Sequence, residues 1–151
     1  MSTVMSVRPG QPRCRIAPAA LTLIESARHG LADAAGEASP GTRYVGAHLA
    51  ALRAAAAIVA VKMGPGQSPR RKAPRSVWEL LPRVEPALSE WAAFFAAGAG
   101  KRAAAEAGLV RAVSAREADD LLRDAETFLN LAEEALGLPA GQSALPLRPA
   151  G

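Results

Sequence analysis

Residues 42–63 carry the longest apolar pattern in the chain. Apolar side chains recur there at alternating steps of four and three residues, the spacing that places them on one stripe of an α-helix. They are Val45, Leu49, Leu52, Ala56, Val59 and Met63, and Ala55, Ile58 and Val61 widen the stripe. A helix that is apolar over so much of its circumference has to be covered by other helices. The pattern therefore predicts a buried central helix whose alanines let its neighbours approach closely.

A second helix is predicted before this segment, over residues 18–36. Pro18 suits a first helical turn, where its missing amide hydrogen would have no partner, and Gly36 suits a helix end. The apolar face consists of Leu21, Ile24, Ala27, Leu31 and Ala34. Ser39 followed by Pro40 is a start signal that leads into the central helix.

Several shorter helices are predicted between residues 76 and 107. Ser76 and Glu79 have the spacing of a capping box, so a helix begins there. Pro82 lies too far into that pattern for a first-turn proline, and we expect a kink or a one-turn helix that restarts near Val84 and runs to Ala97. A short helix over 101–107 follows. This part supplies most of the large core side chains, namely Leu80, Leu81, Val84, Leu88, Trp91, Phe94 and Phe95.

The clearest amphipathic helix is predicted over residues 115–136. Ser114 and Glu117 form a second capping box, and Gly137 is the expected C-terminal stop. The apolar positions keep the helical period for about six turns; they are Ala118, Leu121, Leu122, Ala125, Phe128, Leu129, Ala132 and Leu136. These patterns together predict an all-α, up-down bundle of four to five helices over residues 18–138.

Three segments carry no such period. Residues 1–17 contain prolines and arginines and are predicted to be a flexible basic leader, residues 64–74 a loop, and residues 139–151 a disordered tail. A chain of 151 residues that is 50% hydrophobic has the size of one domain.

The charge is unevenly distributed along the chain. The net charge is +4, yet the segment 115–136 has seven acidic residues against Arg116 and Arg123, and residues 1–114 sum to +8. Such a division fits a basic face for a polyanion, or an acidic helix that packs beside basic neighbours.

Compartment and membrane signals are few. The single cysteine, Cys14, excludes a disulfide within one chain and a four-cysteine zinc site, so a cytoplasmic location is expected. The first residues lack the apolar core of a signal peptide, and the apolar run 54–61 is far shorter than the roughly 20 residues that span a bilayer. We expect no membrane partner.

Candidate acid-base chemistry centres on the histidines His29 and His48. Arg43 and His48 have the spacing of an arginine, four residues and a histidine. Five positions along a helix turn by about 140°, so the two side chains share a face only if the helix begins between them. A packed or surface role is therefore the competing interpretation for either histidine.

Metal and cofactor motifs are absent from the sequence. Glu117, Asp119, Asp120 and Asp124 are close together, but no E-x-x-H motif accompanies them, and acids favour the positive end of a helix dipole. No phosphate-binding loop, dinucleotide fingerprint, nucleophile elbow or zinc-ligand spacing occurs. We expect no metal and no cofactor.

Candidate nucleic-acid contacts are cationic. They are Arg70, Arg71, Lys72 and Arg75, with Lys101 and Arg102 further along the chain. Such cations can bind phosphates by releasing counterions, but no aromatic residues are interleaved to stack on bases. The competing interpretation is a solvated loop.

The order of these helical patterns resembles the HEPN superfamily (higher eukaryotes and prokaryotes nucleotide-binding), and more specifically an uncharacterised actinobacterial HEPN subfamily. The resemblance covers about 18–138. It is carried by the stretches A-H-L-A-A-L-R-A-A-A-A-I-V-A-V-K, S-V-W-E-L-L-P-R-V-E-P, E-W-A-A-F-F-A-A-G and A-R-E-A-D-D-L-L-R-D-A-E-T-F-L.

The resemblance implies two alternative functions. Many HEPN proteins share an R-x(4-6)-H motif near the start of a late helix, which serves metal-independent RNA cleavage across a dimer. Here the late helices contain no histidine, and the matching pair, Arg43 and His48, falls in the segment 42–63. We therefore prefer a non-catalytic binding module, with RNA or a protein as partner and a homodimer as one possible assembly. The alternative is a ribonuclease that uses Arg43 and His48.

Overall fold

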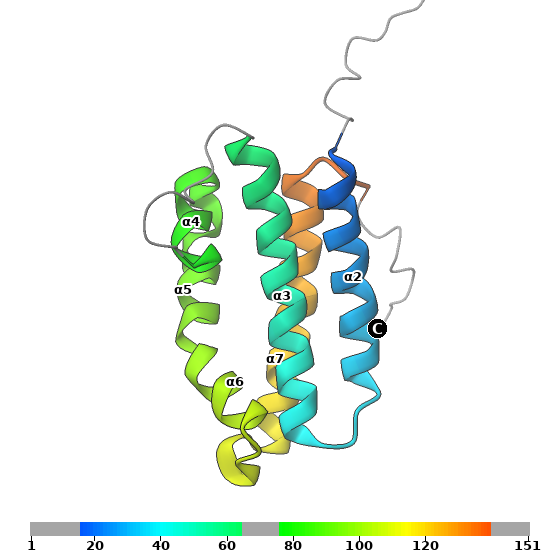
Figure 1. Cartoon of the computed structure of the whole chain (residues 1–151), viewed down its shortest axis with the longest axis vertical. Helices are drawn as coiled ribbons and strands as arrows, with labels where there is room; N and C mark the ends of the chain where they lie inside the picture. The colour runs from blue at the N-terminus through cyan, green and yellow to red at the C-terminus, as the bar shows by residue number, and fades with distance from the viewer. Residues whose placement is uncertain (1–15, 65–75, 140–151) are drawn as a thin grey trace, which may run out of the picture.

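The computed structural model describes residues 16–64 and 76–139. In these ranges the chain forms α-helices and no strand, which confirms the predicted all-α class. The α-helices are α2 (Pro18–Ala35), α3 (Pro40–Met63), α4 (Val77–Val84), α5 (Ser89–Ala97), α6 (Ala99–Glu106) and α7 (Ala115–Ala135), with one-turn 3-10 helices η3 (Pro86–Leu88) and η4 (Val110–Ala112). Helices α2, α3, α5 and α7 run in alternating directions as an up-down bundle (Figure 1).

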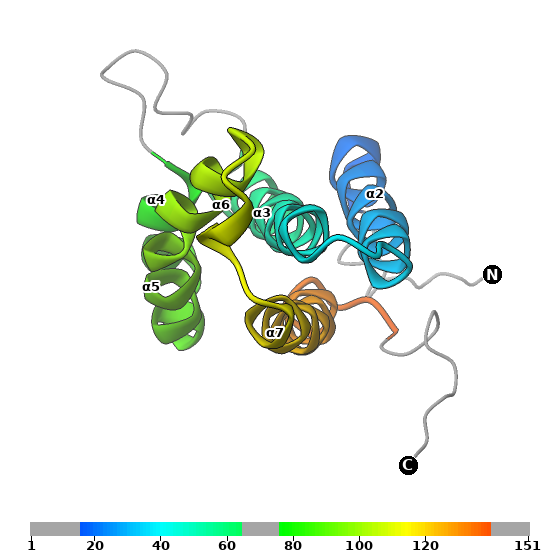
Figure 2. The same ribbon diagram turned by 90° about the horizontal axis from the view of Figure 1, so that it is seen from below.

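Helix α3 is the central element of this bundle. It contacts α2, α4, α6 and α7, and the view along the helices places it between α2 and the α4–α6 group, with α7 along one side (Figure 2). Ten of its residues are buried, more than in any other described helix. The prediction of a buried central helix is confirmed.

The predicted buried stripe of α3 was wrong in its residues. Of the six stripe positions only Val59 is buried, whereas the other five, from Val45 to Met63, are partly exposed; of the three residues that widen the stripe, Ala55 and Ile58 are buried as predicted. The buried positions are instead Tyr44, Ala47, His48, Ala50, Ala51, Ala54, Ala55, Ala57, Ile58 and Val59. Six of these ten residues are alanines, whose small side chains allow neighbouring helices to approach closely.

The length and apolar composition of α3 would also allow it to span a bilayer. Among the described residues it is the one helix of this kind, with a mean hydropathy of 1.6 in its most apolar window. Half of that window is buried inside the bundle, as is usual for the core helix of a globular domain.

Gly46 sits where α3 passes closest to α2. A Cβ built at Gly46 would lie 2.9 Å from the Cβ of Ala34, a distance that side chains do not tolerate. We expect Gly46→Ala to lower the free energy of unfolding by about 1–2 kcal/mol, because overpacking outweighs the gain in helix propensity. Gly100, in α6, has open space around it. Gly100→Ala is expected to raise the free energy of unfolding by about 0.5–1 kcal/mol. Urea denaturation compares the two variants, and equal effects would contradict the close approach.

Local hydrogen bonds set the helix ends largely as predicted. The Ser39 hydroxyl accepts from the Thr42 amide at 3.4 Å and begins α3. At the start of α7 the Ser114 hydroxyl accepts from the Glu117 amide at 3.1 Å, and the Glu117 carboxylate accepts from the Ser114 amide at 2.9 Å, a complete capping box. After α7, Gly137 adopts a positive φ of 76° and the chain closes in a Schellman motif.

The break between α4 and the helices that follow it does not lie at Pro82, where it was predicted. Pro82 lies inside α4 without ending it, and the break comes after Val84. Glu85 is extended, with φ −144° and ψ 78°, because a residue that precedes a proline, here Pro86, is pushed out of the helical region. The Ser76 hydroxyl caps α4 by accepting from the Glu79 amide at 3.2 Å, but the described contacts do not include the reciprocal bond of a capping box.

Two predicted core residues are on the surface. Phe94 is 45% exposed and Leu21 37% exposed, whereas Phe95, Phe128, Leu81 and Leu129 are fully buried. Val84, Trp91 and Leu122 are partly buried. Trp78, which the sequence singled out only within its cap, is buried and joins the aromatic cluster.

The predicted leader, loop and tail lie mostly outside the described residues, in 1–15, 65–75 and 140–151. Within the described part, Ile16 already packs against the core. The first described helix, α2, begins at Pro18.

Candidate functional site

His48 is the buried polar residue at the middle of the bundle. It is fully buried on α3, and its Nε2 donates a hydrogen bond to the Phe95 carbonyl oxygen of α5 at 2.8 Å. A carbonyl oxygen can only accept, so Nε2 carries the proton and Nδ1 of the neutral ring is an acceptor. Arg102 of α6 places its Nη1 3.5 Å from Nδ1. Both ring nitrogens are thus directed at protein groups.

Aromatic rings enclose this histidine. Tyr44 stacks beside it at a centroid distance of 6.4 Å, and Trp78 and Phe95 present their edges at 6.1 and 5.9 Å. Gly98 permits the packing, because a Cβ there would lie 2.8 Å from the Tyr44 hydroxyl. Among the described residues, the His48 ring is left with no solvent-exposed surface.

Burial lowers the pKa of His48 below its ordinary value of 6.5; the hydrogen bond to Phe95 opposes this shift, and the nearby Arg102 charge adds to it. The unfolded chain therefore binds a proton more readily than the folded one, so stability is lost as the pH falls below about 6.5. Desolvation also raises the pKa of the neighbouring Tyr44, against the opposing charge of Lys101.

We expect acid to destabilise the wild type more than a His48→Gln variant, because glutamine can also donate to the Phe95 carbonyl but does not titrate. Urea unfolding at about pH 7 and about pH 5 measures the difference. If both proteins lose the same stability between these two pH values, His48 does not carry a lowered pKa.

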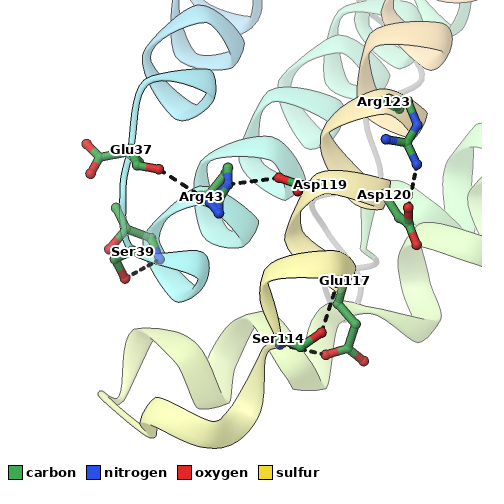
Figure 3. Close-up of polar contacts among 9 residues, drawn as sticks. Glu37, Ser39, Arg43, Ser114, Glu117, Asp119, Asp120 and Arg123 are labelled. Carbon is green, nitrogen blue, oxygen red and sulfur yellow. Dashed lines mark hydrogen bonds and ion pairs between the residues drawn. The ribbon is translucent and has the colours of Figure 1, made fainter.

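Arg43 lies on another part of α3 and does not contact His48 in the described structure. Its Nε is 3.3 Å from a carboxylate oxygen of Asp119, and its Nη1 donates to the Glu37 carbonyl at 3.4 Å (Figure 3). These contacts join the start of α3 to the start of α7. Arg43 and His48 both lie within α3, and the described contacts of each are with different partners.

The candidate nucleic-acid residues fall into two groups. Arg70, Arg71, Lys72 and Arg75 lie outside the described residues. Lys101 and Arg102 are on α6, where Lys101 donates to Glu117 at 2.8 Å and the Arg102 Nε lies 3.7 Å from Glu106. The contact with Lys101 lowers the pKa of Glu117 and raises that of Lys101. Both described cations are thus already paired with carboxylates.

Ion pairs also account for much of the acidic helix α7. Glu133 binds Arg28 of α2, Asp119 binds Arg43 of α3, and Glu117 binds Lys101 of α6. The interpretation of an acidic helix beside basic neighbours is therefore confirmed for these three acids. In the part of the chain that the structure describes, no three metal-ligating side chains converge.

A sequence profile of the SAV_6107-like HEPN family matches residues 34–133, from the end of α2 through most of α7. The chain belongs to this HEPN family. The resemblance to the HEPN superfamily that was inferred from the helical patterns is thereby confirmed. Neither a curated protein nor a solved structure matches the chain.

This HEPN protein also has a surface that the sequence did not reveal. Glu90, Trp91 and Phe94 of α5 and Asp124 of α7 line a groove of about 310 Å³. A signal for it exists in the sequence, because neighbouring residues on a helix point about 100° apart, so Phe94 and Phe95 are directed at different surroundings.

Proposed function

We propose that this chain is a non-catalytic HEPN binding module of the cytoplasm. The observation that carries the proposal is the burial of His48: its Nε2 is held by the Phe95 carbonyl and its Nδ1 faces Arg102. A general base has to come within hydrogen-bond reach of the proton that it removes. His48 has no exposed atom, and Arg43 is engaged with Asp119 on another face.

A protein partner is better supported than RNA. Lys101 and Arg102 face carboxylates, and phosphates would compete with these existing pairs. An RNA partner is supported by the charge of +8 over residues 1–114 and by Arg70, Arg71, Lys72 and Arg75. RNA bound through these cations would dissociate steeply with added salt. A homodimer is compatible with either partner.

The test of the proposal is incubation of the purified full chain with single-stranded and structured RNA. We expect no cleavage by the wild type and none by Arg43→Lys or His48→Gln. Cleavage that persists through purification and is lost in either variant would establish the ribonuclease alternative. Circular dichroism of both variants controls for loss of folding.

A further inference from the structure

A groove with an aromatic floor runs between α5 and α7. The hollow of about 310 Å³ lined by Trp91, Phe94, Glu90 and Asp124 meets a second hollow of about 270 Å³ that includes Asp120. Phe94 and Asp124 line both hollows, so the two form one continuous surface. We call it the α5/α7 groove.

Of the two rings in the aromatic floor, Trp91 packs against the core and Phe94 is exposed to solvent. Trp91 packs against the buried rings of Phe95 and Phe128, with centroids 6.0 and 5.9 Å away. Phe94 meets Trp91 edge-on at 6.2 Å and is 45% exposed. Exposed aromatic surface of this kind is characteristic of interaction sites, because a rigid ring loses little conformational entropy on binding.

The rim of the groove is mainly acidic, and Lys101, the one cation among its described lining residues, is paired with Glu117 at 2.8 Å. In the described ranges no cation pairs with Glu90 or Asp124, and Asp120 pairs with Arg123 on its own helix. Partial burial raises the pKa of Asp124, and the nearby Asp120 charge raises it further against the opposing effect of Arg123. A cation that enters the groove would relieve this repulsion.

We propose that the α5/α7 groove binds an arginine-bearing segment of a partner protein. A guanidinium can lie on the faces of Trp91 or Phe94 and at the same time donate to the carboxylates of the rim. RNA is disfavoured in the groove because its phosphates would face Glu90, Asp120 and Asp124. The inference rests on the proposed function, since it names the chemistry of the partner that the binding module takes.

The test uses the full chain and a short fluorescent peptide of alternating arginine and glycine, with a glutamate–glycine peptide as its charge-reversed control. Fluorescence anisotropy measures the affinity. We expect Phe94→Ala and Asp124→Asn each to weaken binding of the arginine peptide about tenfold. Glu134→Gln is the matched control, because it removes one exposed charge from α7 outside the groove. It should change the affinity less than about twofold.

Four outcomes would overturn the inference. They are no binding of the arginine peptide at low salt, equal weakening by all three variants, self-association of the chain that Phe94→Ala abolishes, and RNA binding that Phe94→Ala abolishes. The first two outcomes leave the absence of RNA cleavage unaffected, so failure of this inference is distinguishable from failure of the proposed function. Phe94→Ala removes a half-exposed ring, and circular dichroism confirms that each variant folds.

Discussion

Replacing Ile58 by aspartate is expected to unfold the protein. Ile58 is fully buried in the second half of α3, the helix that the rest of the bundle surrounds. A carboxylate buried without a partner costs several kcal/mol. That cost is comparable with the whole stability of a small domain, roughly 5–15 kcal/mol. Far-ultraviolet circular dichroism during thermal unfolding measures the loss of helix.

The matched control for this variant is Ala60→Asp, two residues further along α3. Ala60 is exposed, so its variant should stay folded with a small change in the midpoint of unfolding. Leu52→Asp should fall between the two, because Leu52 is only partly buried. Equal thermal stability of Ile58→Asp and Ala60→Asp would contradict the central position of α3.

Arg28→Met should lower the free energy of unfolding by about 3 kcal/mol, the second largest effect that we expect. Arg28 donates to Glu133 at 2.8 and 3.1 Å and to Asn130 at 2.7 Å. The two ionic side chains are only 17% and 8% exposed. Without Arg28 the Glu133 carboxylate would stay buried and unpaired, and its desolvation would oppose folding.

The double variant Arg28→Met, Glu133→Leu separates this cause from a loss of packing. It removes both charges and keeps apolar volume, so we expect it to regain most of the lost stability. Urea denaturation of the two single variants and the double variant gives the coupling energy. If the double variant loses as much free energy of unfolding as the two single variants combined, the effect of Arg28→Met does not come from the unpaired Glu133 carboxylate.

Features set by local chemistry were predictable from the sequence. Ser39, Ser114 and Gly137 mark helix ends because their side chains or backbone freedom satisfy amide and carbonyl groups within a few residues. The apolar period of α7 also predicted its buried face, because polar residues fill the opposite face and leave one orientation.

Features set by packing between distant parts of the chain were not predictable from the sequence. Helix α3 is apolar on nearly every side, so its sequence does not distinguish the face lined by Ala51 and Ala54 from the face with Leu49 and Leu52. Residue type did not reveal that Phe94 is exposed and Phe95 buried, although both are equally apolar.

The surroundings of His48 were likewise hidden from the sequence. The Phe95 carbonyl is 47 residues away and Arg102 is 54 residues away along the chain. Spacing along one helix drew attention to Arg43, yet the arginine nearest to the ring comes from α6. Contacts between helices, rather than a motif, decide the role of this histidine.

The state of the His48 ring tests the central claim most directly. Nitrogen-15 NMR of histidine-labelled protein reports which ring nitrogen is protonated. We predict a neutral ring at pH 7 with the proton on Nε2, and no change of its signals when RNA is added. A ring that is protonated at that pH, or whose signals shift on titration with RNA, would contradict a buried, non-catalytic histidine.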